Sequence, residues 1–315
     1  MRRFSVGGFI ATLAFLAFGL DAEARKVTDQ LNREVELIEK PLRVVATAPS
    51  LAEMAADFLG ADLGRLVGVT EYSDHPPRLR AVPSIGPYHQ LNLEKIQALK
   101  PDLVLATTDG NSKDQIQHLI ENGLNVVVVS TRSFQEIATA MQIVGSSLGD
   151  PEAGKNMGAQ FLLGIARIQE RVKDRAEKPT VLLQVGDDPL VVAGGPSFLT
   201  QTLEALGARN LYADTKIPYP RPALEDIVHR NPDVILILTL GADPKPHLAS
   251  LKRWSSMKRL KATRHARLHI IQGDSVVRPT LRLLEGLALL ERAIFGENQA
   301  TKNQLPIKSL DGNKK

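Results

Sequence analysis

The stretch DPEAGKNMGAQFLLGIARIQERVKDRAEK, residues 150–178, decides the fold. Its apolar side chains recur at steps of three and four residues, which puts one continuous stripe along a helix. They are Met157, Phe161, Ile165, Ile168 and Val172. Asp150 followed by Pro151 is typical of a helix start, because aspartate caps free backbone N–H groups and proline fits the first turn. We therefore predict one long helix with a single buried face.

The segments on either side of this helix resemble each other. Leu93-Glu94-Lys95-Ile96 is followed at residue 101 by Pro-Asp-Leu-Val-Leu, and Leu224-Glu225-Asp226-Ile227 is followed at residue 232 by Pro-Asp-Val-Ile-Leu. The two copies align without a gap. Each has the pattern of a short helix with an acidic first turn, a Pro-Asp turn and a buried strand. A long helix between two copies of one unit indicates two similar lobes with a cleft between them.

Apolar strand patterns alternate with helical patterns in both halves of the chain. The predicted strands cover residues 43–47, 66–69, 103–106, 126–129, 181–185, 234–238 and 268–271. Such alternation is typical of α/β domains with a mostly parallel sheet. The predicted fold class is α/β, with two Rossmann-like lobes bridged by a single long α-helix. We expect an N-terminal lobe at 25–149, the interlobe helix at 150–178 and a C-terminal lobe at 179–296.

The two ends of the sequence differ in composition from the lobes. Arg2 and Arg3 precede an apolar run at 9–20, and Ala22-Glu23-Ala24 has the pattern of a cleavage site. This run is too short to favour a transmembrane helix, so we predict that residues 1–24 are a secretory signal peptide. Residues 297–315 are polar and are predicted to form a flexible tail.

The composition excludes several classes of function. The 315 residues include no cysteine, which excludes disulfides, thiolate metal sites, a cysteine nucleophile and a lipid anchor on an N-terminal cysteine. The formal net charge of +4 is spread along the chain, and aromatic residues make up only 4%. A nucleic-acid surface would combine clustered basic residues with aromatics, so no nucleic-acid partner is predicted.

The sequence offers little support for catalysis or metal binding. Gly149 and Gly154-Lys155 have the spacing of a phosphate-binding loop, but Asn156 stands where Ser or Thr would hold magnesium. His75 and His89 lie in two loops that could meet at the cleft, whereas zinc needs three or four ligands. We therefore predict a binding protein that is not an enzyme and holds no metal or cofactor of its own.

Four segments carry a more specific signal. They are GVTEYSDHPP at 68–77, NLEKI at 92–96, ALKPDLV at 98–104 and IPYP at 217–220. With them, residues 42–295 resemble the periplasmic solute-binding proteins of ABC importers for cobalamin and ferric siderophores, most closely the cobalamin (vitamin B12) branch. The resemblance implies a class III periplasmic binding protein fold, in which one long helix bridges two lobes that close little on binding. It also implies a monomer that is soluble in the periplasm after cleavage near Ala24.

The resemblance places the ligand contacts on loops that face the cleft. The ligand-binding residues it implies are Tyr72, Tyr88, Tyr219, Asp274 and Arg278. Aromatic rings suit a flat corrin ring because they bury wide apolar surface at low entropic cost. Three of the four tyrosines of the chain fall on these loops. Asp274 and Arg278 would hydrogen-bond to amide groups on the rim of a corrinoid.

The sequence departs from the family pattern at two of these positions. Similar cobalamin-binding proteins often carry tryptophan where Tyr88 and Tyr219 stand. Tyrosine keeps a stacking face but changes its area and adds a hydroxyl, so the ligand stays open between a corrinoid, a ferric siderophore and haem. Arg221, Arg278 and Arg282, near the expected cleft, would suit an anionic ferric siderophore. An exported sensor or enzyme that uses the same cleft is the alternative from another class.

Glu94 and Glu225 have a second role by resemblance. In the family, one acidic residue on each lobe docks against arginines of the membrane permease. The two glutamates occupy equivalent places in the repeat, so a symmetric transporter could meet one on each lobe. An acid in the first turn of a helix also stabilises that helix by about 0.3–1 kcal/mol. The matched positions favour docking, and the predicted partner is an inner-membrane ABC permease with its ATPase.

Overall fold

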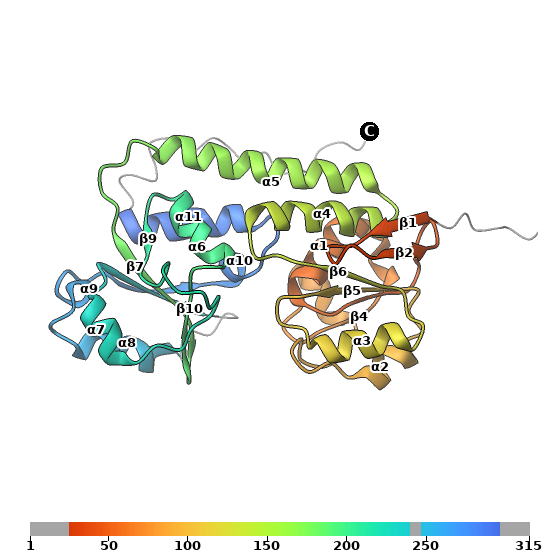
Figure 1. Cartoon of the computed structure of the whole chain (residues 1–315), viewed down its shortest axis with the longest axis horizontal. Coiled ribbons are helices and arrows are strands. Elements are labelled where there is room, and N and C mark those ends of the chain that lie inside the picture. The colour runs from red at the N-terminus through yellow and green to blue at the C-terminus, as the bar shows by residue number, and fades with distance from the viewer. Residues whose placement is uncertain (1–24, 240–246, 297–315) are drawn as a thin grey trace, which may run out of the picture.

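The computed structural model describes residues 25–239 and 247–296 of the chain. Two α/β lobes lie side by side, and one long helix, α5, lies across both of them (Figure 1). The predicted signal peptide and the predicted tail lie outside the described residues. Within those residues, no helix combines the length and the apolar composition needed to cross a membrane.

The first lobe is built on a four-stranded parallel sheet with the strand order β4-β3-β5-β6. Its strands are almost wholly apolar because helices cover both faces of the sheet. The strands are β3 (Val44–Ala46), β4 (Leu66–Val69), β5 (Leu103–Thr107) and β6 (Val126–Val129). The helices are α1 (Pro49–Leu59), α2 (Leu93–Ala98), α3 (Lys113–Glu121) and α4 (Phe134–Leu148), with 3₁₀ turns η1 (Gly60–Arg65) and η2 (Pro77–Ala81).

The second lobe has a sheet of order β11-β10-β7-β8, in which β9 also pairs with β7 and only β8 is antiparallel. The strands are β7 (Thr180–Asp187), β8 (Leu190–Val192), β9 (Arg209–Asn210), β10 (Val234–Thr239) and β11 (Leu268–Gln272). The helices are α6 (Phe198–Ala205), α7 (Leu224–Arg230), α8 (Leu248–Ser256), α9 (Lys261–Arg264), α10 (Asp274–Val277) and α11 (Leu283–Phe295).

A leading hairpin of β1 (Arg25–Thr28) and β2 (Glu34–Leu37) covers the open edge of β6. The main-chain N–H of Gln30 donates to the carbonyl of Val128 at 3.0 Å. The carboxylate of Asp29 accepts from the N–H of Val128 at 3.2 Å, and the side chain of Gln30 accepts from Ser130 at 2.8 Å. The hairpin thus satisfies backbone groups that an edge strand would leave unpaired.

The sequence repeat has a structural counterpart in the two Pro-Asp turns. Asp102 precedes β5 and accepts hydrogen bonds from the main-chain N–H groups of Leu42 and Arg43, at 2.7 and 2.9 Å. Asp233 precedes β10 and accepts from the N–H of Thr180 at 2.9 Å. In each lobe the aspartate therefore ties the start of one interior strand to the start of its neighbour.

The predicted interlobe helix is α5, Pro151–Val172, which ends before the expected Lys178. Asp150 caps it, since its side chain accepts from the N–H of Ala153 at 2.9 Å. Phe161, Ile165 and Val172 are buried as the stripe predicts. Two buried glycines, Gly154 and Gly158, extend this face toward the start of the helix.

These glycines bring the backbones of α4 and α5 into direct contact. A Cβ atom at Gly158 would lie 2.6 Å from the carbonyl oxygen of Ala138, and one at Gly154 would lie 2.8 Å from that of Gln142. Both distances are shorter than any normal contact. The spacing of four residues places the two glycines on the same face of α5. Only glycine therefore allows the two helices to approach this closely.

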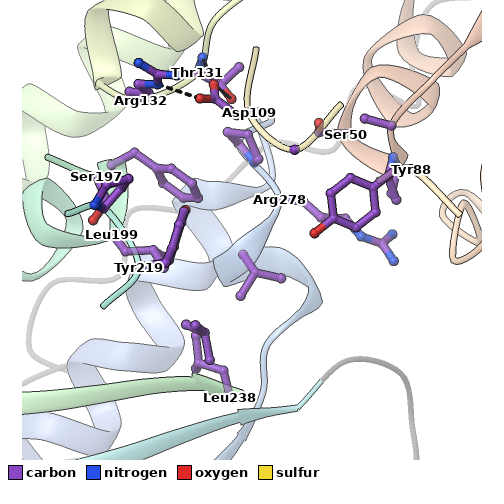
Figure 2. A pocket seen from close by; sticks show the side chains of 18 of the residues that line it. Ser50, Tyr88, Asp109, Thr131, Arg132, Ser197, Leu199, Tyr219, Leu238 and Arg278 are labelled. Carbon is purple, nitrogen blue, oxygen red and sulfur yellow. Dashed lines mark hydrogen bonds and ion pairs between the residues drawn. The ribbon is translucent and has the colours of Figure 1, made fainter. Parts of the chain in front are cut away.

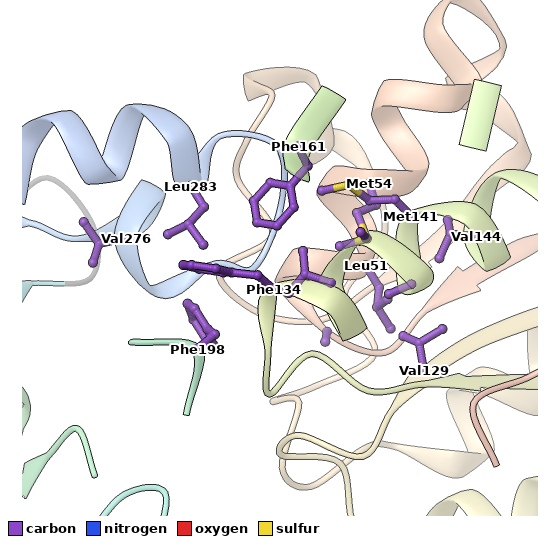
Figure 3. Close-up of a cluster of buried hydrophobic side chains, with 14 of the residues drawn as sticks. Leu51, Met54, Val129, Phe134, Met141, Val144, Phe161, Phe198, Val276 and Leu283 are labelled. Carbon is purple, nitrogen blue, oxygen red and sulfur yellow. The ribbon is translucent and has the colours of Figure 1, made fainter. Parts of the chain in front are cut away.

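The two lobes share one hydrophobic core where α4 and α5 meet the C-terminal lobe (Figure 3). The ring of Phe134 meets that of Phe161 edge-to-face, with 5.9 Å between centroids. Phe198, Val276 and Leu283 of the second lobe belong to the same cluster. A core that runs through both lobes opposes rigid-body opening, because separation would expose these side chains to water.

Replacing Gly158 with alanine tests the contact between α4 and α5. The added methyl group meets the backbone of α4, so we expect the free energy of unfolding in urea to fall by about 1–3 kcal/mol. Gly64→Ala is the matched control, because nothing lies within 4 Å of a Cβ atom there. Equal stabilities of the two variants would contradict the close approach.

Candidate ligand-binding cleft

A cavity of about 570 Å³ lies between the two lobes. It is bordered by residues that follow the carboxyl ends of strands in both sheets, the usual position of ligand sites in open α/β folds. In the first lobe these are Ala48, Thr108 and Thr131, and in the second lobe Val185 and Leu238 stand at the strand ends. The starts of α1 and α6 also reach the cavity, through Ser50 and Phe198 among others. Both lobes therefore contribute equivalent elements to the cleft.

The three predicted tyrosines all line this cavity. Tyr72, Tyr88 and Tyr219 are 66%, 40% and 43% exposed, so three accessible aromatic side chains gather around one cavity. Figure 2 shows Tyr88 of the first lobe and Tyr219 of the second on opposite sides of the cleft. The cleft thus presents an aromatic face from each lobe.

Tyr72 is held in an uncommon backbone conformation. Its φ of 63° lies in the left-handed region, which costs a non-glycine residue about 1–3 kcal/mol. Its carbonyl oxygen accepts a hydrogen bond from the guanidinium of Arg278 at 2.7 Å. The N–H of the preceding residue, Glu71, donates to the carbonyl of Gly86 at 3.1 Å. These bonds hold the loop in a conformation that leaves the Tyr72 side chain exposed to solvent.

Tyr88 is fixed through both its ring and its backbone. A Cβ atom at Gly110 would lie 2.3 Å from the ring of Tyr88, so the ring packs directly on this glycine. The carbonyl oxygen of Tyr88 accepts from the side-chain amide of Asn111 at 2.7 Å. The same amide donates to the carbonyl of Thr47 at 2.8 Å, which ties the loop to the end of β3.

Tyr219 stands on a loop that packs against a strand end of the second lobe. The N–H groups of Val192 and Gly194 donate to the carbonyls of Pro220 and Pro218, at 3.1 and 2.8 Å. Desolvation in the cleft raises the pKa of the Tyr219 hydroxyl, and the negative charge of Asp109 raises it further. The hydroxyl therefore keeps its proton at neutral pH and can donate a hydrogen bond.

Of the two predicted polar residues, Arg278 lines the cavity and Asp274 does not. Arg278 lines the cavity, but the residue is only 5% exposed and its guanidinium turns away toward the first lobe behind Tyr88 (Figure 2). There it pairs with Asp74 at 2.8 Å and with Asp274 at 3.2 Å. Asp274 begins α10 and is not among the residues that line the cavity. The structure places this pair in a contact between lobes.

A second arginine joins the same contact. Glu53 of α1 is 1% exposed and accepts from the Nε atom of Arg282 at 2.9 Å and from the hydroxyl of Thr280 at 2.5 Å. Arg278 also lies 3.6 Å from the Glu53 carboxylate. Arg278 and Arg282 thus neutralise acids of the first lobe, which leaves them poorly placed to receive an anionic ligand. Arg221 is exposed and is not among the residues that line the cavity.

The sequence reasoning missed several residues of the cleft. Asp109 and Arg132 line the cavity and form an ion pair of 2.7 Å, and Phe198 and Leu199 add apolar surface from the start of α6. Asp109 and Arg132 follow β5 and β6 closely, so the rule that sites lie beyond the carboxyl ends of strands could have indicated them.

Within the described residues, the stretches whose sequence imitates a catalytic or phosphate-binding motif lie at helix ends. A G-x-S-x-G pentapeptide at 145–149 lies at the end of α4 rather than between a strand and a helix, and its buried Ser147 donates to the carbonyl of Ile143 at 2.7 Å. Gly149 ends the same helix with φ of 98°. Within residues 25–239 and 247–296, no group of three or more His, Cys, Asp or Glu is arranged to hold a metal ion.

A family model described as periplasmic binding protein matches residues 44–274. The chain belongs to this family. Its fold is that of a class III periplasmic binding protein, as the sequence predicts. The family members that it resembles are named as binding proteins rather than as enzymes.

Known periplasmic binding proteins resemble this chain in both sequence and structure. The vitamin B12-binding protein of Salmonella typhi is 32% identical over 195 residues, which cover 62% of this chain and 71% of that protein. The solved periplasmic vitamin B12 binding protein of Vibrio cholerae aligns with a TM-score of 0.70 at 24% identity, over 84% of this chain and 99% of that one. A periplasmic heme binding protein from Pseudomonas aeruginosa aligns with a TM-score of 0.69 at 27% identity, over 80% and 92% of the two chains.

Glu94 and Glu225 lie outside the cleft of this family member. Both side chains are exposed in the first turns of α2 and α7. Figure 1 shows α2 and α7 at the end of each lobe that lies away from α5. Each of these two helices therefore carries an exposed glutamate on the side opposite the interlobe helix.

Replacing Arg278 with methionine tests the contact between the lobes. The change leaves the half-buried Asp74 and Asp274 without this cation and removes the bond to the Tyr72 carbonyl, so we expect a loss of about 1–3 kcal/mol in the free energy of unfolding. Urea denaturation measures it, with Arg80→Met as the control at an exposed arginine. A loss no larger than that of the control would show that the buried ion pairs do not stabilise the fold.

Proposed function

We propose that this protein captures cobalamin or a related corrinoid in the interlobe cleft and delivers it to an inner-membrane ABC transporter. The observation that carries the proposal is the pair of exposed rings, Tyr88 and Tyr219, on opposite sides of a cleft in a chain related to vitamin B12-binding proteins. In this proposal residues 1–24 are removed near Ala24, and the mature monomer acts in the periplasm.

The chemistry of the cleft suits a large flat ligand with a polar rim. The wall is mainly apolar, and residues such as Val191, Phe198 and Leu238 line it together with the tyrosines. Aromatic rings stack on a planar macrocycle and lose little conformational entropy when they do so. The tyrosine hydroxyls at the cleft add hydrogen-bond partners for polar groups at the ligand's edge.

The cleft is largely formed before the ligand arrives. Two features join the lobes. One is the shared core around Phe134 and Phe161, and the other is the set of ion pairs that Arg278 and Arg282 form with acids of the first lobe. Small adjustments of loops therefore suffice for binding, as in other pre-organised sites.

Haem is the second candidate, because a heme binding protein of similar fold is 27% identical and tyrosine is a known haem ligand. Haem would use a tyrosine as an iron ligand, whereas a corrinoid would use the faces of the two rings. A ferric siderophore is less favoured because Arg278 and Arg282 are engaged by acids of the first lobe.

Alanine variants of the two facing tyrosines test the ligand assignment. We expect Tyr88→Ala and Tyr219→Ala to weaken cyanocobalamin binding roughly 10-fold or more each, because each removes about 1–3 kcal/mol of stacking. Calorimetric titration of residues 25–315 gives the affinities. Tyr88→Phe and Tyr219→Phe keep the ring and lose only the hydroxyl, so each should weaken binding less than the corresponding alanine variant. Clear binding of hemin but not of cyanocobalamin by the parent protein would move the proposal to haem.

We also propose that Glu94 and Glu225 dock on the permease. Charge reversal by Glu94→Lys and Glu225→Lys should abolish ligand-dependent transport in proteoliposomes that contain the transporter, while cyanocobalamin affinity stays unchanged. Glu152→Lys is the matched control, because Glu152 is an exposed acid in the first turn of α5 on the opposite side. Normal transport by the double variant would refute docking through these residues and would favour a sensor role.

A further inference from the structure

The charged residues that line the cleft differ in what they can offer a ligand. They are Asp109, Arg132 and Arg278. The guanidinium of Arg278 is buried and donates to Asp74, Asp274 and the carbonyl of Tyr72. All three bonds leave from Nη2, whereas Nη1 lies 3.6 Å from the Glu53 carboxylate and makes no hydrogen bond to the described residues. Acids of the protein therefore offset the charge of Arg278, and the more exposed charges in the cavity wall belong to Asp109 and Arg132.

The carboxylate of Asp109 already accepts hydrogen bonds from residues of its own lobe. Its Oδ2 atom accepts from the main-chain N–H of Thr131 at 2.6 Å and from the Thr131 hydroxyl at 3.0 Å. Its Oδ1 atom accepts from the Nε atom of Arg132 at 2.7 Å. Both carboxylate oxygens thus have donors already, and Asp109 acts as an anchor for Arg132 (Figure 2).

Arg132 keeps part of its guanidinium available. Its main-chain N–H donates to Glu136 at 2.8 Å, which fixes the base of the residue. The side chain is 56% exposed and uses Nε for Asp109. Within residues 25–239 and 247–296, its two terminal nitrogens make no hydrogen bond or ion pair. A guanidinium held through Nε can present those two nitrogens as a planar donor pair.

Tyr219 adds a donor to the same region from the other lobe. Asp109 and Arg132 of the first lobe and Tyr219 of the second line the same cavity (Figure 2). This end of the cavity therefore combines a cation with a protonated hydroxyl. Such a set complements oxygen acceptors on a ligand rather than donors.

We propose that Arg132, positioned by Asp109, binds an oxygen-acceptor group at the edge of the ligand and sets the specificity of the cleft. This inference rests on the proposed corrinoid ligand. Two groups of a corrinoid carry the required chemistry: the phosphodiester of its nucleotide tail and the carbonyls of its peripheral amides. Both can accept two parallel hydrogen bonds or a close pair of bonds from a guanidinium.

Titration of the Arg132→Gln variant with two corrinoids tests the assignment. Cyanocobalamin carries the nucleotide tail, whereas dicyanocobinamide lacks its phosphodiester and base. We expect the variant to bind cyanocobalamin roughly 10–100-fold more weakly than the parent, the range for a lost hydrogen bond to a charged group. A loss confined to cyanocobalamin assigns the contact to the phosphodiester, and an equal loss for both ligands assigns it to the amide carbonyls.

Controls separate a binding defect from a folding defect. Arg221→Gln removes an exposed arginine outside the cavity wall and should leave both affinities unchanged. The thermal midpoint of Arg132→Gln should match that of the parent, because an exposed ion pair contributes little to stability. Arg132→Lys keeps the charge without the planar donor pair and should recover only part of the affinity.

The outcomes distinguish this inference from the proposed function. Binding of both corrinoids by Arg132→Gln within twofold of the parent would overturn the role of Arg132 and leave the corrinoid assignment standing. Absence of corrinoid binding by the parent itself would overturn the proposed function, and the inference would fail with it.

Discussion

The backbone contact between α4 and α5 is the constraint on which the rest of the structure depends. Glycines at 154 and 158 let α5 lie directly on α4, and the same helix then continues over the second lobe. Phe161 follows on the same face and meets Phe134 in the core that both lobes share. Larger side chains at positions 154 and 158 would push α5 away from this core. The spacing between the lobes, and with it the width of the cleft, is thus set by helix packing.

Buried charge reinforces this arrangement at the base of the cleft. Glu53 and Asp74 of the first lobe face Arg282 and Arg278 of the second, and such pairs tolerate little separation once they are out of water. Because Arg278 and Arg282 pair with these acids, the walls of the cavity are mainly apolar and aromatic. Arg132 is the accessible cation among the described residues that line it.

The internal repeat gives the two lobes equivalent outer surfaces. The aspartates of the Pro-Asp turns, Asp102 and Asp233, tie neighbouring strands together at equivalent places. The short helices that precede them carry Glu94 and Glu225 on the side away from α5. In the proposed docking, these two glutamates are the groups that would meet a two-fold symmetric partner.

The sequence by itself determined the features that local patterns encode. Periodicity predicted α5, alternation predicted the parallel sheets, and the repeat predicted two lobes. The resemblance to a known family added three tyrosines on loops that face the cleft. Only the tertiary structure decided the roles of Arg278, Asp274 and Arg282, because the acids that bind these arginines in the first lobe lie more than two hundred positions away in the chain. It also decided that Asp109 and Arg132 meet, since they follow different strands whose ends come together only in the folded sheet. Periodicity and motifs record neighbours along the chain, whereas the contacts that shape this cleft join residues that folding alone brings together.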